Sequence, residues 1–256
     1  MNILYVARVC RHDLLFAVNA LARTVSNWTL ASDKKLLRLI SYMHASKSMK
    51  SCAIMGDNRL RDLTLSVFVD AGGDGGITTT RSTTGLFIAL IGPCTFWPIL
   101  AMSKRQTVVS RSSTESEVTA VDTALRTEAI SILYFLHQVQ GVLENTAPDA
   151  GGGSGPASHD RRKITSVPEF TEFAQKQKYD NAIQTAKLLG NSKLEAPADR
   201  MKMLVLEDNE AAIKILEKGR SMAIRHVART HRISIEWLRE VLNWPEVYLR
   251  YIHTRS

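Results

Sequence analysis

The chain has 256 residues, of which 45% are hydrophobic and 23% charged, so it can bury a core and does not belong to the disordered class. Lysine and arginine outnumber aspartate and glutamate by 33 to 25, a formal charge of +8, which fits a nucleic-acid partner or a merely basic protein equally well. Cys10, Cys52 and Cys94 form no CxxC pair, which argues against a disulfide framework or a zinc site and favours a reducing compartment.

The N-terminus opens with apolar residues at Ile3 to Ala7, but Arg8, Arg11, His12 and Asp13 follow too soon for a signal peptide. No apolar run approaches the roughly 20 residues that a membrane span needs. We therefore expect a soluble, intracellular protein, cytoplasmic or nuclear, that is not secreted and has no membrane partner.

Residues 13–50 predict two basic amphipathic helices. Apolar residues recur at helical spacing in the first helix (Leu14, Val18, Leu21, Val25) and in the second (Leu36, Ile40, Met43). The cations of the second helix, Lys34, Lys35 and Arg38, favour a solvated face over a binding site.

From Asp62 the hydrophobic period changes to two, because Leu63, Leu65, Val67 and Val69 alternate with other residues as in a half-buried strand. Gly72, Gly73, Gly75 and Gly76 predict a turn. Two further strands are expected over 83–91 and 95–102, separated by Gly92-Pro93. These three strands predict an antiparallel meander.

A long helix follows, with Ser112 or Ser113 as its cap and an apolar stripe at Val118, Val121, Leu125, Ala129, Ile132 and Leu136. Residues 144–199 have the composition of a Gly-rich linker, with a possible short helix over 168–189. A strand over 203–206, a helix over 209–218 closed by Gly219, a helix over 234–243 and a strand over 247–252 complete the chain. This order predicts a mixed α/β fold.

Three carboxylates stand at the ends of these elements. Asp70 and Asp208 each end a strand, and Glu115 lies in the first turn of the long helix, three residues before Val118, which aims it inward. Taken singly, Glu115 also fits a first-turn acid at the helix N-terminus, and Asp208 fits a helix cap. Together, adjacent strand ends and a helix head can bring them within a few ångströms, where a cation offsets their repulsion. Oxygen ligands select Mg²⁺ or Mn²⁺, and two such ions can hydrolyse a phosphodiester.

The motifs around these acids resemble the ribonuclease H domain of copia-type retrotransposon Pol polyproteins. The run Ser103 to Glu117, SKRQTVVSRSSTESE, is similar to the family's SKKQ..VA.SSTEAE signature. In the same order, Val69-Asp70-Ala71 and Arg81 to Gly85 resemble SDADW and RRSTSG, and Glu207 to Ile213 resembles CDNQSAI.

The N-terminal residues are similar to the end of the family's reverse transcriptase region, on the strength of Ile3 to Arg8, Asp13 and Ala17 to Arg23. The resemblance thus implies a helical tail of that region over 1–52 and a ribonuclease H-like domain over 62–143 and 200–256, with 144–199 as insert. It also implies that the chain derives from a longer polyprotein and works beside its upstream reverse transcriptase region.

By this resemblance, Asp70, Glu115 and Asp208 are catalytic metal ligands for Mg²⁺ or Mn²⁺, with two ions, in an enzyme that cleaves the RNA strand of RNA–DNA hybrids. The family's K-H-I-D is matched by Arg225 to Ala228, so Ala228 stands at the expected position of a fourth catalytic aspartate, and Glu236 is the nearest downstream acid. His226 and His231 flank the same loop, where a histidine can move a proton or simply pack.

Cations and hydroxyls just before the helix head form a candidate phosphate-binding group of Lys104, Arg105, Arg111, Ser112 and Ser113. A solvated basic loop explains Lys104 and Arg105 equally well. A hybrid would be bound through its backbone and the 2′-hydroxyls of its RNA strand, with weak sequence preference.

Three functions are therefore compared. The first is a metal-dependent endoribonuclease. The second is a catalytically degenerate copia-type remnant that retains the fold and nucleic-acid binding, which Ala228 and the insert favour. The third, a protein-interaction module, depends only on the helix expected over 168–189.

Overall fold

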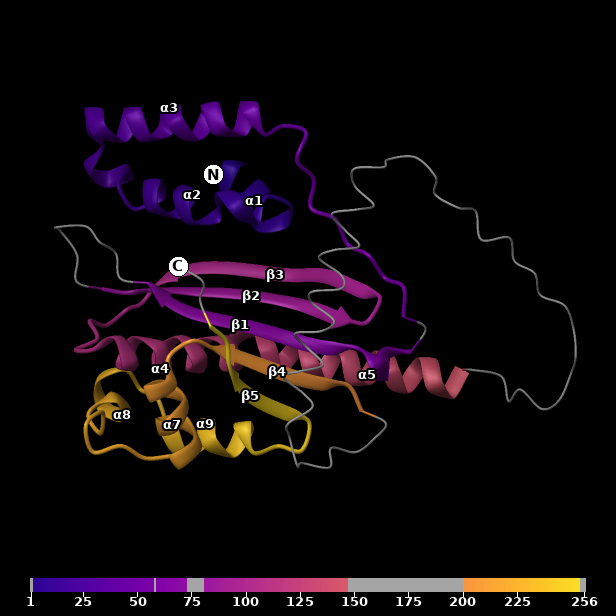
Figure 1. Cartoon of the computed structure of the whole chain (residues 1–256). Coiled ribbons are helices and arrows are strands. Elements are labelled where there is room, and N and C mark those ends of the chain that lie inside the picture. The colour runs from indigo at the N-terminus through magenta and orange to yellow at the C-terminus, as the bar shows by residue number, and fades with distance from the viewer. Residues whose placement is uncertain (1, 58, 73–80, 147–199, 254–256) are drawn as a thin grey trace, which may run out of the picture.

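The computed structural model describes residues 2–57, 59–72, 81–146 and 200–253 (Figure 1). The elements in chain order are α1 (Asn2–Val9), α2 (Leu15–Ala22), α3 (Leu30–Ala45), β1 (Thr64–Gly72), β2 (Thr83–Gly92), β3 (Thr95–Arg105), α4 (Ser113–Ala124), α5 (Ile130–Thr146), β4 (Lys202–Glu207), α7 (Glu210–Lys218), α8 (Val227–Thr230), α9 (Ile235–Leu242) and β5 (Val247–Tyr251). A π-helical turn, Leu125–Ala129, joins α4 to α5.

One five-stranded sheet organises the fold, in the order β3-β2-β1-β4-β5. β1 pairs with β2 and β2 with β3 antiparallel, which confirms the meander, whereas β4 runs parallel to both β1 and β5. Helices lie on both sides of the sheet (Figure 1). The mixed α/β fold expected from the sequence is therefore confirmed, and the arrangement is consistent with a ribonuclease H-like fold.

The main core lies between the sheet and α4, α5, α7 and α9. Buried residues of β1 and β4 such as Leu65, Val67 and Val205 pack there with Val118 and Leu125 of the long helical segment. The first four residues of β1 are all buried. The strand is therefore covered on both sides over this stretch, and not half-buried as its alternating pattern predicts.

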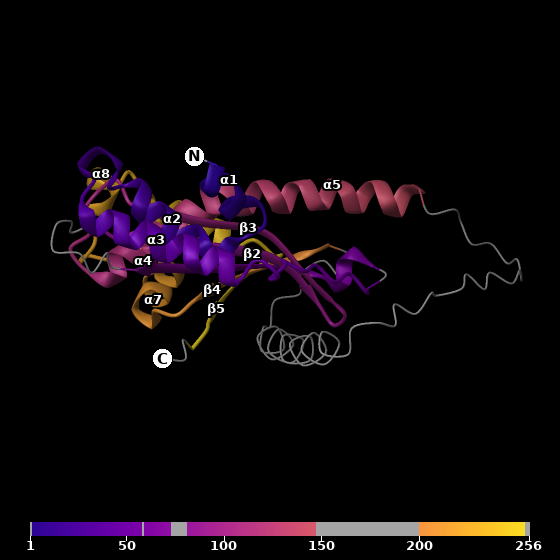
Figure 2. The ribbon, with the colours of Figure 1, turned by 90° about the horizontal axis from the view of Figure 1, so that it is seen from above.

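The N-terminal helices form a second, smaller core against β3, which includes Leu14, Val18 and Leu39. Figure 1 shows these helices on the opposite side of the sheet from α4, and Figure 2 shows them from above. The Asn19 side chain donates to the carbonyl of Ser103 at 3.0 Å, which joins α2 to β3. The sequence predicted two helices here and missed α1.

Some of the predictions concern residues that the structure does not describe. The glycine turn after Gly72 and the helix expected over 168–189 lie outside the described residues, as does nearly all of the Gly-rich segment. Across the described ranges, none of the helices combines the length and apolar character needed to cross a bilayer.

Helix ends follow the sequence signals closely. Ser112 caps α4, with its hydroxyl accepting the backbone N–H of Glu115 at 3.2 Å, and Asn209 caps α7 in the same manner. α7 ends at Gly219, whose φ of 72° lies in the left-handed region. A glycine is favoured there because a Cβ atom crowds the backbone in that conformation.

Replacing Gly219 with alanine should destabilise the protein. The new Cβ would collide with the aliphatic part of the Arg239 side chain and would add left-handed strain, so the free energy of unfolding should fall by about 1–2 kcal/mol. Gly141→Ala is the matched control, because nothing lies within 4 Å of a Cβ built there inside α5. That control should raise stability by up to about 1 kcal/mol. Chemical denaturation of both variants measures the difference, and shifts of the same sign would contradict the assignment.

Candidate metal centre

Three carboxylates from three separate elements converge at one end of the sheet. Single oxygens of Asp70, Glu117 and Asp208 all lie within 4.8 Å of one another. Asp70 is exposed, Asp208 is intermediate and Glu117 is buried. We call this group the acidic cluster.

Strand register brings the two aspartates together. β1 and β4 pair in parallel as far as Phe68 opposite Leu206, and the same register continued by two residues sets Asp70 opposite Asp208. Because parallel strands end at the same edge of a sheet, both carboxylates project there. α4 packs across β1 and adds Glu117 from its first turns.

Glu117 is buried deeply enough for its ionisation to be unfavourable. Burial raises its pKa to about 9, and the negative charges of Glu207, Asp70 and Asp208 add to this effect, while a hydrogen bond with the backbone of Ala71 opposes it. The pKa of Asp70 is also raised, first by partial burial of its carboxyl group in an otherwise exposed residue and then by the charge of Asp208.

Glu207 is a fourth acid beside the acidic cluster. It is fully buried at the end of β4, and burial raises its pKa to about 8, against the opposing effect of a hydrogen bond from the Asn209 backbone N–H. In the sequence, Glu207 reads only as the last position of a buried strand, so it did not stand out as a candidate ligand. The signal that it offered was a carboxylate where such a strand normally carries an apolar side chain.

The acidic cluster has the chemistry of a site for a hard divalent cation. Oε2 of Glu117 and Oε2 of Glu207 are buried and have no hydrogen-bond partner among the described residues. A buried carboxylate without a donor is costly, and nearby carboxylates repel one another unless a positive charge intervenes. Oxygen-only ligands of this kind fit Mg²⁺ or Mn²⁺.

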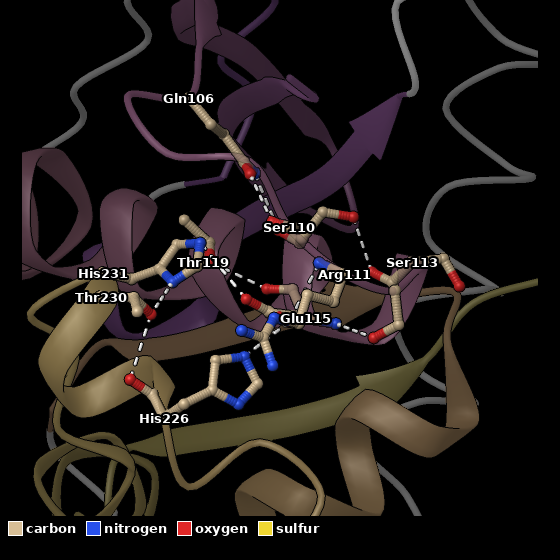
Figure 3. A network of polar contacts seen from close by, with 11 residues as sticks. Gln106, Ser110, Arg111, Ser113, Glu115, Thr119, His226, Thr230 and His231 are labelled. Atoms are coloured by element: carbon tan, nitrogen blue, oxygen red, sulfur yellow. Dashed lines mark hydrogen bonds and ion pairs between the residues drawn. The ribbon is translucent and has the colours of Figure 1, made fainter. Parts of the chain in front are cut away.

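Glu115 does not belong to the acidic cluster, contrary to the sequence prediction. Its side chain is 1% exposed and lies between two histidines, with Oε2 3.2 Å from Nε2 of His226 and Oε1 3.4 Å from Nε2 of His231 (Figure 3). Its Oε2 also accepts the backbone N–H of Arg111 at 3.1 Å. Glu115 therefore joins the head of α4 to the segment around α8.

The difference between the two glutamates follows from helix geometry. Two residues span about 200° of rotation, so Glu115 and Glu117 point to nearly opposite sides of α4. Both are buried, because nearly every residue from Glu115 to Asp122 is covered. An apolar stripe identifies the inward face of a helix with one buried side and does not separate two buried sides.

The residues expected to assist catalysis in the α8 segment lie away from the acidic cluster. His226 contacts Glu115, and the pKa of His231 is lowered, mainly by burial. Ala228 and Glu236 line a pocket between α7 and α9, and within the described residues neither joins the group of potential metal ligands.

The candidate phosphate-binding residues fall into two groups. Lys104 and Arg105 end β3 and line a small cavity of about 130 Å³ together with Arg126 and Asp122 of the α4 segment. Ser112 is occupied as the helix cap, and the Ser113 carbonyl accepts the hydroxyl of Ser116 at 2.7 Å. Arg111 uses its backbone N–H on Glu115, as described above. Their binding of nucleic acid remains a prediction.

Comparison with known proteins finds a likeness to a curated protein. No protein-family model matches the chain, and no solved structure does. Among curated proteins, the chain is 29% identical over 139 residues to "Secreted RxLR effector protein 161" of Plasmopara viticola, an alignment that covers 54% of this chain and 92% of that protein.

This likeness contradicts the localisation expected from the sequence. We expected an intracellular protein that is not secreted, whereas the similar protein is described as secreted. The expectation depended on the first residues, where Arg8 and Arg11 interrupt the apolar run, on the lack of an apolar run long enough to span a membrane, and on the unpaired cysteines. We do not retain it.

Proposed function

We propose that this chain is a metal-dependent endoribonuclease that cleaves the RNA strand of RNA–DNA hybrids. The observation that supports it is the convergence of Asp70, Glu117 and Asp208 from β1, α4 and β4. The likeness of its motifs to the copia-type ribonuclease H domain and its charge of +8 point the same way. On this proposal the chain acts in retrotransposon reverse transcription, beside the reverse transcriptase region of the same polyprotein.

The acidic cluster would hold two Mg²⁺ or Mn²⁺ ions through Asp70, Glu117 and Asp208. When bound, such ions supply an activated water and stabilise the leaving oxygen of a phosphodiester. The hydrogen bond with the Ala71 backbone orients the buried Glu117, whereas Asp70 is exposed to solvent. Glu207, buried beside the acidic cluster, would add negative potential that favours cation binding once it is ionised.

Substrate contacts would come from the protein's cations and not from base recognition. Lys104 and Arg105, at the end of β3, would contact backbone phosphates. Such contacts read the shape of a hybrid and its 2′-hydroxyls, so cleavage should show weak sequence preference.

The purified protein should cleave the RNA strand of a hybrid in Mg²⁺ or Mn²⁺, and Asp70→Asn should lower the rate by on the order of 100-fold or more. The cause is the loss of a negative ligand where β1 and β4 meet. Asp62→Asn, an exposed aspartate just before β1, is the matched control and should cleave as the wild type does. Complete lack of cleavage by the wild type across a titration of both metals would refute the proposal.

A second candidate is a catalytically silent remnant that retains the fold and binds nucleic acid. It is favoured by Ala228 and by a group of potential metal ligands that, across the described ranges, contains three residues and no fourth. In the same assay this candidate predicts salt-dependent binding of the hybrid with no turnover in either metal.

A further inference from the structure

A basic pocket lies between α7, α8 and α9, with a cavity volume of about 1040 Å³. Among the described lining residues, Glu236 is the one acid. Five cations line the pocket: Lys214, Lys218, Arg220, Arg225 and Arg232. These cations come from the end of α7 and from the segment that leads through α8 to α9. We call this the basic pocket.

Most of these cations have no protein partner. In the part of the chain that the structure describes, Lys218, Arg220, Arg225 and Arg232 make no ion pair or side-chain hydrogen bond. Lys214 reaches Glu210 at 3.5 Å, but both side chains are largely exposed, and surface pairs of this kind contribute little. Like charges gathered without counter-charges destabilise the folded state, and a bound anion would relieve that repulsion.

The segment that carries these cations is held in place by buried contacts. Ile224, Val227 and Ile233 are buried in the main core, and Glu115 contacts His226 and His231 from the head of α4 (Figure 3). The pocket wall is therefore anchored at several points along its length.

Arg232 has a backbone conformation that side chains rarely adopt. Its φ is 58°, in the left-handed region, between the buried side chain of His231 and the buried Ile233. This conformation leaves both neighbours buried while Arg232 lines the pocket. Backbone strain at an exposed arginine lowers the stability of the fold, so stability does not explain this conformation. Strained positions of this kind are concentrated at functional sites.

We propose that the basic pocket binds the phosphodiester backbone of a nucleic acid, outside the acidic cluster. Guanidinium groups match phosphate oxygens in a two-pronged geometry, and Arg229 of α8 adds a further cation on the same segment. α7 and α8 lie at the same end of the fold as the head of α4, which carries Glu117 (Figure 1). The identity of the anion as a nucleic acid rests on the proposed function, whereas the anion site itself rests on the cations.

Binding of a short hybrid duplex to the full chain, measured by fluorescence anisotropy in EDTA so that no cleavage occurs, tests this. Arg225→Gln/Arg232→Gln should weaken binding by about 10-fold or more at low salt and make the slope of log K against log salt shallower by about 1–2. Arg8→Gln/Arg38→Gln removes the same charge from exposed positions of α1 and α3 and should change affinity far less. Arg220→Gln/Arg225→Gln repeats the test without altering the strained position.

Three results would overturn the inference. The first is an equal loss of affinity in the pocket variants and in the Arg8/Arg38 control, which would mean that only net charge matters. The second is wild-type affinity in both pocket variants while circular dichroism shows them folded. The third is equally tight, Arg225-dependent binding of polyglutamate, which would assign the pocket to acidic proteins. If the wild type never cleaves but the pocket variants still lose duplex binding, the anion site is upheld and the proposed nuclease activity is refuted.

Discussion

Glu117→Gln should abolish metal-dependent cleavage of hybrid RNA, with a fall in single-turnover rate of on the order of 100-fold or more, whereas Glu115→Gln should retain most of it. The two residues stand two positions apart on α4 and have the same chemistry. Only Glu117 lies within ligand distance of Asp70 and Asp208, whereas Glu115 contacts His226 and His231.

Metal binding separates the two variants independently of cleavage. Isothermal titration calorimetry with Mn²⁺ should show that Glu117→Gln loses the heat of metal binding and that Glu115→Gln keeps it. Glu115→Gln should instead lower thermal stability, because a neutral amide holds the two histidines less strongly than a carboxylate does. The opposite pattern, in which Glu115→Gln alone loses Mn²⁺ binding, would restore the assignment that the sequence suggested.

The metal-free protein should lose stability as the pH rises from 7 to 9. The folded state holds the pKa of Glu117 at about 9 and that of Glu207 at about 8, whereas both lie near 4.3 in an unfolded chain. The folded chain therefore keeps protons that the unfolded chain has already released. Their stabilising effect is fully present below the unfolded pKa and disappears as the pH rises through 8 and 9.

The window from pH 7 to 9 spans the folded-state pKa values of these two groups. The pKa of Asp13 is lowered by Arg11 and that of His231 mainly by burial, so both shifts move titration away from this window. We expect the free energy of unfolding in EDTA to fall by about 1–3 kcal/mol across this window. Added Mg²⁺ should remove most of the fall, because a bound cation favours the ionised carboxylates.

Glu117→Gln provides the matched control for this prediction. Without metal it should be more stable than the wild type at pH 8, since a glutamine is neutral when buried and need not take up a proton on folding, and its stability should not respond to Mg²⁺. Urea denaturation at each pH measures both effects. A wild-type curve that is flat from pH 7 to 9 in EDTA, and unchanged by Mg²⁺, would contradict the cation site.

Much of the fold was predictable from local patterns. The period-two runs from Asp62 predicted β1 to β3, and Ser112 and Gly219 predicted helix ends that the structure has, whereas α7 is capped by Asn209 and not by Asp208. Asp70 and Asp208 could also be placed at strand ends, because a strand boundary is a local property of the sequence. These signals act over a few residues and survive in almost any tertiary context.

Only the tertiary structure decided which glutamate joins those aspartates. Hydrophobic spacing marked Glu115 as inward and gave no sign that Glu117 is buried as well, because α4 is buried on more than one side. The choice depends on the rotation of α4 over β1 and on a segment more than a hundred residues later that brings His226 and His231 to Glu115. The same long-range packing gathers the cations of the basic pocket, because charges that are spread along one segment share a cavity only after α7, α8 and α9 have folded together.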